Sequence, residues 1–368
     1  MNILVINLDK AIFKKNSASF ERLKEYSAIV EKLFVIVWTR EKFSPIIFDD
    51  RLVIYPTNSS CRLFYYFDTW RLARNILRKN KIDLIFTQDP FETGLAGVLL
   101  AVFNRIKLQL QFHTDVFSLY FWRQSRTNKI RVMLAKVLIK RADSLRVVSA
   151  RIKTSLIKLG VASEKIFVLP IYTDVGKITG ASVKLDLKSK YPQFEKIILM
   201  ASRLSPEKNI GLAIEAMLKV VKKQPRIGLI IFGSGREEVR LKSLIKKNGL
   251  ASRVILETWT DDLASYYKTA DLFLLTSNYE GWGMAAVEAM AAGCPVIMTD
   301  VGCAGELVKD GENGFIVPVG DGDVLSQTII RVLGDHKLGE SLTRRAAETI
   351  KKLADKEEYL RQYKKSWL

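Results

Sequence analysis

Short runs of apolar, β-branched residues alternate with longer amphipathic segments along this chain of 368 residues. The alternation predicts strand–helix units, because parallel neighbouring strands need a crossover long enough to hold a helix. In the first half we expect helices at 68–80 and 130–142. The strands expected there cover residues 3–8, 33–38, 52–56, 83–88, 107–112, 144–149 and 165–170.

The pattern stops after Pro170 and starts again at residue 196. Residues 171–194 contain no clear strand and are expected to form a linker with a short helix. Because 368 residues exceed what one hydrophobic core usually serves, we predict two α/β domains, 1–175 and 176–354, each a Rossmann-like, doubly wound parallel sheet. The strands expected in the second sheet cover residues 196–202, 227–233, 253–258, 271–277, 295–300 and 314–318.

Positive charge is concentrated in the first half. Of the net charge of +19, +15 falls within residues 1–170, which hold 29 Lys and Arg against 14 Asp and Glu. This asymmetry is typical of a surface that faces a polyanion, either nucleic acid or an anionic membrane. It is also compatible with solubility alone.

The segment from Phe117 to Ala142 combines basic and aromatic residues. It holds seven basic residues, no acidic residue, and the aromatic cluster Phe117, Tyr120, Phe121 and Trp122. Such a segment suits an anionic bilayer interface, so we predict contact with a membrane surface. A helix with a solvated basic face fits the pattern as well, and in either case we expect packing on the sheet through Met133, Leu134, Val137 and Leu138.

Several classes of protein are disfavoured. No apolar run is long enough to span a bilayer, and Met1 leads directly into a strand without a basic region or a cleavage site. We therefore expect no signal peptide, and a cytoplasmic protein. Cys61, Cys294 and Cys303 share no ligand spacing and are expected to be buried thiols, so neither a disulfide framework nor a zinc site is predicted.

Ligands of doubly wound sheets bind outside the carboxyl ends of strands, which makes the residues after each strand the candidate site. Arg203 and Lys208 follow the first strand of the second half and suit a diphosphate, although a solvated helix start would look similar. Gly233-x-Gly235 follows the next strand. It is a tight turn before a helix but an incomplete dinucleotide motif, because Glu238 stands where the third glycine should be.

A third strand is followed by "NYEGWGMAAVE" (278–288), in which the carboxylates Glu280 and Glu288 lie on either side of a Gly-Trp-Gly turn. A helix starting near Gly283 or Met284 would place Glu280 in the loop and Glu288 one turn inside the helix. The acids would then lie at different depths along a ligand, which suits binding to sugar hydroxyls better than acid/base catalysis. Asp321-Gly322-Asp323 resembles an Asp-x-Asp metal site but reads more simply as a helix N-cap, so no metal is predicted.

Together these motifs resemble one large family. Arg203-x4-Lys208, Gly233-x-Gly235, Glu280-x7-Glu288 with "EAMAAGCPVI", and "VKDGENGFIVPVGD" are similar in order and spacing to the retaining nucleotide-sugar glycosyltransferases of the fourth sequence family, the glycosyl transferases of group 1. The resemblance covers residues 196–334. It implies the GT-B fold, in which two Rossmann-like domains face each other across a cleft, the first binding the acceptor and the second the donor. It also implies that a C-terminal helix, 355–368, packs back on the first domain.

The resemblance assigns roles to the candidate residues. It implies that Arg203 and Lys208 neutralise the diphosphate leaving group, that Glu288 holds the ribose hydroxyls, and that Glu280 holds the transferred sugar. It further implies a UDP- or GDP-linked sugar as donor substrate, front-face displacement with retention, no bound metal and no permanent cofactor. The expected donor-binding residues are Arg203, Lys208, Gly233, Thr258, Trp259, Glu280, Gly281, Trp282, Gly283, Met284, Ala285 and Glu288; Arg203, Lys208 and Glu280 are also expected to act in catalysis.

In the first half the resemblance is partial. His113 directly follows the strand 107–112, where the family often has a histidine beside the reacting sugar carbon, so His113 is the catalytic candidate; a structural role is the alternative. His336 is expected at the surface. The chain departs from the family after its first strand, where "NLDKAIF" lacks the usual glycine-rich turn.

The predicted function is transfer of a hexosyl group, with mannosyl, glucosyl and N-acetylglucosaminyl as candidates, in polysaccharide biosynthesis. The expected acceptor is a lipid-linked or cell-envelope glycan, with the enzyme peripheral on the inner face of the cell membrane. A sugar-nucleotide epimerase or a phosphorylase on the same fold is the alternative. A basic nucleic-acid-binding protein is a more distant one, because no helix-turn-helix, zinc finger or RNA-binding signature accompanies the charge.

Overall fold

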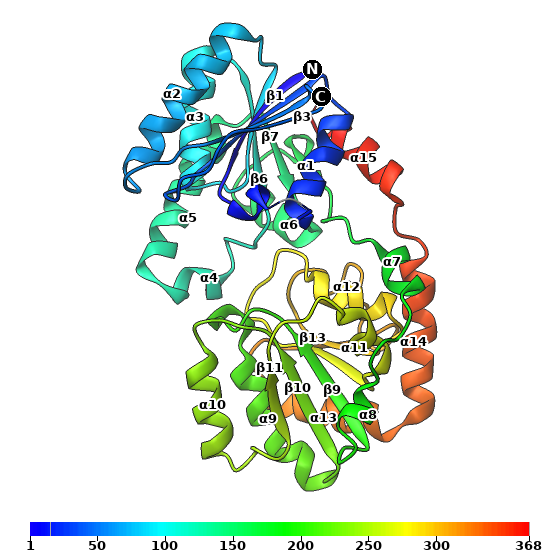
Figure 1. Ribbon diagram of the computed structural model, residues 1–368. Coiled ribbons are helices and arrows are strands. Elements are labelled where there is room, and N and C mark those ends of the chain that lie inside the picture. The colour runs from blue at the N-terminus through cyan, green and yellow to red at the C-terminus, as the bar shows by residue number, and fades with distance from the viewer. Residues whose placement is uncertain (15, 368) are drawn as a thin grey trace. The chain divides into compact units, whose positions relative to one another are not determined.

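The computed structural model describes residues 1–14 and 16–367, and the chain divides into two compact units. Unit 1 runs to Pro170 and also takes the C-terminal residues from Ala354 onward, and unit 2 comprises Ile171–Leu353. The chain thus divides after Pro170 and Leu353, compared with 175 and 354 in the sequence-based division. Leu368, the last residue of the expected C-terminal helix, lies outside the described residues. Figure 1 shows the path of the chain through both units.

Unit 1 is built on an eight-stranded sheet with the order β3-β4-β2-β1-β5-β6-β7-β8. All seven strands expected in this half are present. The unexpected strand is β3, which is three residues long and runs antiparallel to β4 at the edge of the sheet, so the prediction of a purely parallel sheet is wrong there. The strands are β1 (Asn2–Asn7), β2 (Lys32–Val37), β3 (Ile46–Phe48), β4 (Leu52–Pro56), β5 (Leu84–Thr87), β6 (Lys107–Phe112), β7 (Ser144–Val147) and β8 (Ile166–Val168).

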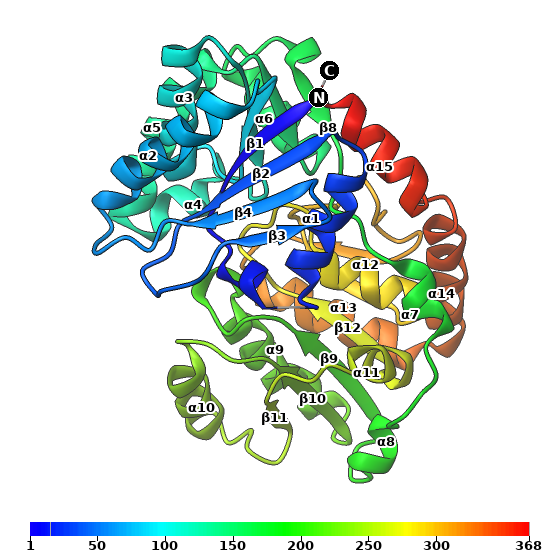
Figure 2. The ribbon, with the colours of Figure 1, turned by 45° about the horizontal axis from the view of Figure 1, so that its top comes forward.

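Helices cover both faces of this sheet. The helices α2, α3 and α5 lie together on one face, and α1 and α15 lie on the other (Figures 1 and 2). The helices of unit 1 are α1 (Ala18–Ala28), α2 (Phe64–Lys79), α3 (Glu92–Asn104), α4 (Leu119–Gln124), α5 (Arg126–Leu138), α6 (Ala150–Lys158) and α15 (Lys356–Lys365), with 3-10 turns at Lys10–Phe13, Ile139–Arg141 and Ser163–Lys165.

Helix α5 buries only part of the expected set. Leu138 is buried as expected and Leu134 is partly buried, whereas Met133 and Val137 are 53% and 62% exposed. The other buried apolar residues of the helix are Val132 and Ala135. Apolar residues at 130, 133 and 137 form a second stripe beside the buried one. Contact with α3 decides which stripe is buried.

Strand β6 has a different character on each face of the sheet. Leu108 and Leu110 point toward α3. This helix can approach the sheet closely because residue 97 is a glycine: a Cβ atom there would lie 2.5 Å from the Thr87 side chain. The alternate residues Gln109 and Gln111 face α15 and are fully buried. A parallel-sheet strand covered on both faces usually carries apolar residues throughout, so these glutamines need partners within the fold.

Unit 2 contains a six-stranded, fully parallel sheet with the order β11-β10-β9-β12-β13-β14. All six expected strands are present, namely β9 (Lys196–Ala201), β10 (Ile227–Phe232), β11 (Val254–Glu257), β12 (Leu272–Leu275), β13 (Val296–Thr299) and β14 (Phe315–Val317). The chain builds outward from β9 to β11 and then returns to the other side of β9. This reversal makes the carboxyl ends of β9 and β12 a topological switch point, where ligands of such sheets bind.

The helices of unit 2 begin with α7 (Val175–Gly180) and α8 (Leu187–Lys190), so the segment 171–194 holds two short helices where we expected one. The others are α9 (Ile210–Lys223), α10 (Glu238–Lys247), α11 (Leu263–Thr269), α12 (Met284–Ala291), α13 (Gly322–Gly334) and α14 (His336–Ile350), with a 3-10 turn at Pro206–Lys208. Within the described residues, no helix of either unit is both long and apolar enough to cross a membrane.

Candidate functional site

The candidate residues of unit 2 gather at one edge of its sheet. Arg203 follows β9, Gly233 follows β10, Thr258 and Trp259 follow β11, and Glu280 follows β12. These four strands are consecutive neighbours in the sheet, and their carboxyl ends share one edge because they run parallel. Four stretches separated by about 20 to 30 residues in sequence are thereby brought to the edge of the sheet that contains the switch point.

An ion pair joins the two sides of the switch point. The Lys208 ammonium contacts the Glu280 carboxylate, and the Ser277 hydroxyl donates a hydrogen bond of 2.7 Å to the same carboxylate oxygen. Only 17% of the Lys208 side chain and 13% of the Glu280 side chain are exposed. The Thr276 hydroxyl donates to the Lys208 carbonyl at 3.0 Å, which ties the two loops together through the backbone as well. Lys208 and Glu280 thus lie in direct contact, which places them close enough together to bind the same ligand.

Arg203 is the most exposed of these charged side chains. Its side chain is 79% exposed and reaches Glu207 at 3.5 Å, a contact too long and too exposed to hold a guanidinium in place. Arg203 can therefore turn toward an anion without breaking a buried interaction.

The loop before α12 depends on glycine. Gly283 has φ 92° and ψ 51°, a left-handed conformation that glycine adopts without strain, and α12 begins at Met284 as the sequence predicts. The Trp282 side chain is 5% exposed and packs in the interior, so only its backbone can meet a ligand. On α12, Met284, Ala285 and Glu288 are partly exposed and the next residues toward the sheet are buried. Glu288 therefore lies on the accessible face of the helix.

Tyr267 of α11 holds Glu288. The Tyr267 hydroxyl donates a hydrogen bond of 3.1 Å to Glu288 Oε2. Burial raises the pKa of Glu288, and the hydrogen bond from Tyr267 opposes that rise without cancelling it. Burial and the adjacent carboxylate raise the pKa of Tyr267 well above its usual value, so the phenol remains a donor at neutral pH. Among the described residues no hydrogen bond reaches the other oxygen, Oε1, which leaves it able to accept from a ligand hydroxyl.

Gly302 supports the loop that carries Glu280. A Cβ atom at Gly302 would lie 2.4 Å from the Trp282 carbonyl oxygen and 3.0 Å from Glu280 Cβ. The next residue, Cys303, donates its backbone N–H to the same carbonyl at 2.8 Å. The turn after β13 therefore packs directly against the 280–282 loop and supports it.

His113 belongs to unit 1 and follows β6. Its Nε2 lies 3.2 Å from Gln111 Oε1. Burial, with a smaller contribution from the positive charges of Arg146 and Arg22, lowers the pKa of His113 to about 3. The ring is therefore neutral at physiological pH and can act as a hydrogen-bond donor and acceptor but not as a cation.

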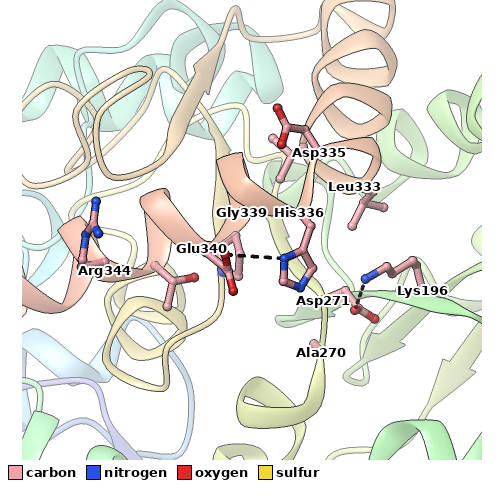
Figure 3. Close-up of a pocket in the computed structure, with 12 residues that line it drawn as sticks. Lys196, Ala270, Asp271, Leu333, Asp335, His336, Gly339, Glu340 and Arg344 are labelled. Carbon is pink, nitrogen blue, oxygen red and sulfur yellow. Dashed lines mark hydrogen bonds and ion pairs between the residues drawn. The ribbon is translucent and has the colours of Figure 1, made fainter.

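His336 is exposed, as the sequence predicts, and contacts Glu340 at 3.5 Å. It lines a cavity of about 360 Å³ together with Lys196 and Asp271 (Figure 3). Lys196 begins β9 and Asp271 immediately precedes β12, so this cavity lies at the amino ends of the strands. It is at the opposite edge of the sheet from the candidate site.

The expected N-cap is confirmed, because the Asp321 carboxylate accepts hydrogen bonds from the backbone of Asp323 and Val324. Within the described part of the chain, no group of three or more His, Cys, Asp or Glu side chains could hold a metal ion. Cys294 and Cys303 are buried, whereas Cys61 is partly exposed, so the expectation of three buried thiols is wrong for Cys61.

Three residues that matter to this geometry were missed in the sequence. Tyr267 orients Glu288, Ser277 binds Glu280, and Gln111 contacts His113. Ser277 follows a strand and could have been noted on that ground. Tyr267 lies within a helix and Gln111 within a strand. The search for site residues directly after strands therefore does not find them.

Two family models match the chain. "Glycosyl transferases group 1" matches residues 185–349, and "Glycosyltransferase Family 4" matches residues 32–176. The chain belongs to the group 1 glycosyltransferases. The first match contains every candidate residue of unit 2, and the second contains His113.

Individual relatives of this glycosyltransferase agree with the family. A poly(glycerol-phosphate) alpha-glucosyltransferase of Bacillus subtilis is 36% identical over 159 residues, which are 43% of this chain and 23% of that enzyme. The UDP-Gal:alpha-D-GlcNAc-diphosphoundecaprenol alpha-1,3-galactosyltransferase of Escherichia coli is 28% identical over 72% of this chain and 69% of its own length. The chain thus matches less than a quarter of the length of the first relative.

The fold has counterparts among solved structures. Anabaena HepE in complex with UDP and glucose superimposes with a TM-score of 0.77 at 21% identity, covering 100% of this chain and 99% of HepE. This likeness identifies the fold as GT-B and confirms the expected fold class.

Replacing Gly302 by alanine is expected to destabilise unit 2 by more than the same change at Gly311. Both glycines have positive φ, 55° and 69°, so each alanine incurs about 1–2 kcal/mol of backbone strain. Only Gly302 is also in close contact with a carbonyl, whereas Gly311 has open space. Thermal unfolding of Gly302→Ala and Gly311→Ala measures the difference, and equal losses would show that the close contact is unimportant.

The depressed pKa of His113 should make stability fall in mild acid. The unfolded chain takes up this proton near pH 6.5 and the folded chain only near pH 3, so the contribution is complete above pH 6.5 and is lost as the pH falls between these values. We expect His113→Asn to lose less unfolding free energy than the wild type between pH 7.5 and 5, by about 2 kcal/mol.

Urea unfolding at the two pH values tests this expectation. His336→Asn, which changes the chain's only other histidine, is the matched control and should lose as much as the wild type. Equal pH dependence of the wild type and His113→Asn would contradict the prediction.

Proposed function

We propose that this protein is a retaining hexosyltransferase. It moves a sugar from a UDP- or GDP-linked donor onto a lipid-linked or cell-envelope glycan at a membrane surface, without a metal ion. The observation that carries the proposal is the contact of Lys208 with Glu280 at the switch point, with Glu288 on the accessible face of the following helix. These three side chains offer a cation and two carboxylates to a ligand that carries both phosphates and hydroxyl groups.

The diphosphate is assigned to Lys208 and Arg203. Negative charge grows on the diphosphate as the bond to the sugar breaks, and cations placed beforehand stabilise that charge most where water is excluded. Lys208 is held in place within the fold, while Arg203 is free to turn toward the phosphates. Backbone N–H groups at the start of α12 add further donors for an anion.

The hydroxyl groups are assigned to the two carboxylates. Glu288 accepts from the ribose hydroxyls through Oε1, while Tyr267 fixes Oε2. Glu280 accepts from the transferred sugar, and its interaction with Lys208 couples sugar binding to diphosphate binding. Thr258 and Trp259, both exposed after β11, are placed where backbone contacts to the base are expected.

His113 is assigned a hydrogen bond to a hydroxyl group of the reacting sugar. A neutral imidazole suits this role, because a cation beside a glycosyl group that develops positive charge would raise the barrier. Retention by front-face displacement needs no protein nucleophile, so the residues hold the donor and stabilise its leaving group.

The relatives support the classes of donor and acceptor. HepE has been solved with UDP and glucose, which supports a UDP-linked hexose as donor. The Escherichia coli relative is named for a diphosphoundecaprenol-linked acceptor, and the Bacillus subtilis relative for poly(glycerol phosphate). Both acceptors support a lipid-linked or cell-envelope glycan here.

One face of unit 1 supports action at a membrane. The helices α2, α3 and α5 expose large apolar side chains, and the Trp70 and Phe103 rings lie 5.5 Å apart across α2 and α3. We call this surface the apolar–basic face; its apolar members are Leu63, Phe64, Phe67, Trp70, Leu99, Val102, Phe103, Ile130, Met133 and Val137, and its exposed basic members are Arg71, Arg74, Arg78, Lys79, Arg105, Arg126, Lys129, Lys136 and Lys140. Apolar residues next to cations suit an anionic lipid surface.

Lys208→Ala and Glu288→Ala are expected to lower kcat/KM for transfer roughly 10²- to 10³-fold while the fold is retained. The donor is first identified by thermal shift against a panel of nucleotide sugars, and transfer is then measured with that donor. Lys219→Ala and Glu340→Ala, which change exposed residues away from the switch point, are the controls and should stay active.

The same assay separates the alternatives. NMR of the product reports retention of the anomeric configuration, and EDTA should leave the rate unchanged. Full activity of Lys208→Ala and Glu288→Ala would remove both residues from the site, and an epimerised nucleotide sugar as product would replace the proposed reaction.

Membrane contact predicts salt-sensitive binding to vesicles that contain anionic lipid. Changing Lys129, Lys136 and Lys140 to alanine should weaken binding roughly 100-fold at low salt, because each cation near the surface contributes about 1 kcal/mol. The loss should shrink at high salt. A control variant removes the same charge from unit 2 at Lys222, Lys246 and Lys247 and should bind as the wild type does. Equal binding of both variants would refute the membrane assignment.

A further inference from the structure

Strand β6 carries two polar residues on one face of the sheet of unit 1, and a third follows its end. Gln109 and Gln111 alternate along the strand, so their side chains project to the same side, and the ring of His113, just after the strand, reaches Gln111. The two glutamines are fully buried under α15. A buried amide lowers stability unless its oxygen and nitrogen are both satisfied, so its partners define which way it points.

The orientation of Gln109 follows from a carbonyl group. Gln109 Nε2 lies 2.6 Å from the Ser366 carbonyl oxygen, which can only accept a hydrogen bond. The nitrogen of Gln109 must therefore point to Ser366. Its oxygen accepts from Gln111 Nε2 at 3.2 Å, which in turn orients the amide of Gln111.

A guanidinium fixes Gln111 independently. Arg146 Nη1 lies 3.2 Å from Gln111 Oε1, and guanidinium nitrogens only donate. A flipped amide would place its N–H groups against this donor. The Tyr363 hydroxyl of α15 lies 3.0 Å from Gln111 Nε2 and adds a further contact to the same amide. The Ser366 carbonyl, acting through Gln109, and the Arg146 guanidinium thus select the same orientation of the Gln111 amide.

The hydrogen position on His113 follows from that orientation. His113 Nε2 lies 3.2 Å from Gln111 Oε1, and an amide oxygen can only accept. Nε2 must therefore carry the hydrogen. Among the described residues, no hydrogen bond reaches Nδ1, which is then the acceptor of the ring.

We infer that Gln111 is a positioning residue that holds His113 in the Nε2–H tautomer and presents Nδ1 as a hydrogen-bond acceptor for a sugar hydroxyl. The C-terminal segment contributes to this arrangement through Ser366 and Tyr363, 257 and 252 residues away in sequence from their glutamine partners. The catalytic consequence rests on the proposed function. The tautomer does not, because it follows from contacts within unit 1.

A second consequence concerns charge. Arg146 is buried within the same network, with its guanidinium 4.5 Å from the centre of the Tyr363 ring. Gln111 Oε1 accepts from both the guanidinium and the imidazole, so a neutral amide separates the two groups. Protonating His113 would place a second buried positive charge beside Arg146, and the described residues offer no carboxylate there to neutralise it, which favours the neutral ring.

NMR tests the tautomer directly in the full chain. After labelling of histidine with 15N, long-range 1H–15N correlations distinguish a protonated from an unprotonated ring nitrogen. The chain has only two histidines, so exposed His336 provides an internal reference. We expect His113 to show an unprotonated Nδ1 and a protonated Nε2 at pH 7. A protonated Nδ1, or averaged signals from both tautomers, would overturn the inference.

Gln111→Met removes the acceptor while keeping the length of the side chain. In this variant the His113 signals should become those of a tautomer mixture. The matched control is Gln362→Met, the same change at an exposed position of α15, which should leave the His113 signals as in the wild type. Unchanged His113 signals in Gln111→Met would show that Gln111 does not set the tautomer. The wild-type spectrum remains decisive if Gln111→Met does not fold.

Kinetics test the consequence for catalysis. Gln111→Met should lower kcat about 10- to 100-fold, the size seen when a hydrogen-bond partner that orients a metal-binding histidine is lost, with KM for the donor changed less than about threefold. Wild-type kcat in Gln111→Met together with an inactive His113→Ala would overturn the positioning role. Full activity of His113→Ala would instead overturn the assigned role of His113, and the NMR result would still decide the tautomer.

Discussion

The ion pair between Lys208 and Glu280 is the constraint on which the candidate site depends. Two largely buried charges are tolerated only when each has its partner, and these partners meet because β9 and β12 are neighbours in the sheet. A ligand that binds Lys208 in place of Glu280 must also donate hydrogen bonds to the Glu280 carboxylate, which would otherwise be left without a partner. On the proposed function, a sugar diphosphate does so, because its phosphate oxygens suit the ammonium and its hydroxyl groups suit the carboxylate.

The need of buried polar groups for partners also determines the face of β6 that α15 covers in unit 1. Buried glutamines and a buried arginine are stable there because α15 brings Tyr363 and the Ser366 carbonyl to them, and the Tyr363 ring stacks on Tyr26 of α1 at 4.3 Å. The network leaves one orientation for each amide. His113 lies at its end, so the C-terminal segment contributes to the hydrogen-bonding state of a residue at a strand end in unit 1.

Much of the fold could be predicted because periodicity is a local property. All thirteen expected strands are present, while β3 was missed because its apolar run is only three residues long, too short to be recognised as a strand. The packing of α5 was wrong for Met133 and Val137, since two apolar stripes lie side by side and contact with α3 selects one. In the site, charged residues and glycines at strand ends were predictable, and Gly283 at the start of α12 is where the sequence placed it. Tyr267 and Gln111 were not, because they act on other side chains from within a helix and a strand.

The sequence by itself determined the repeated strand–helix units, the acids and bases that follow the strands, and through its motifs the family. Only the tertiary structure decided that Lys208 pairs with Glu280, 72 residues away, and that Gln111 meets Tyr363, 252 residues away. The physical reason is that hydrophobic period and turn chemistry are set by neighbours along the chain. The partner of a buried polar group is set instead by strand order and helix packing, which bring together residues that no local pattern connects.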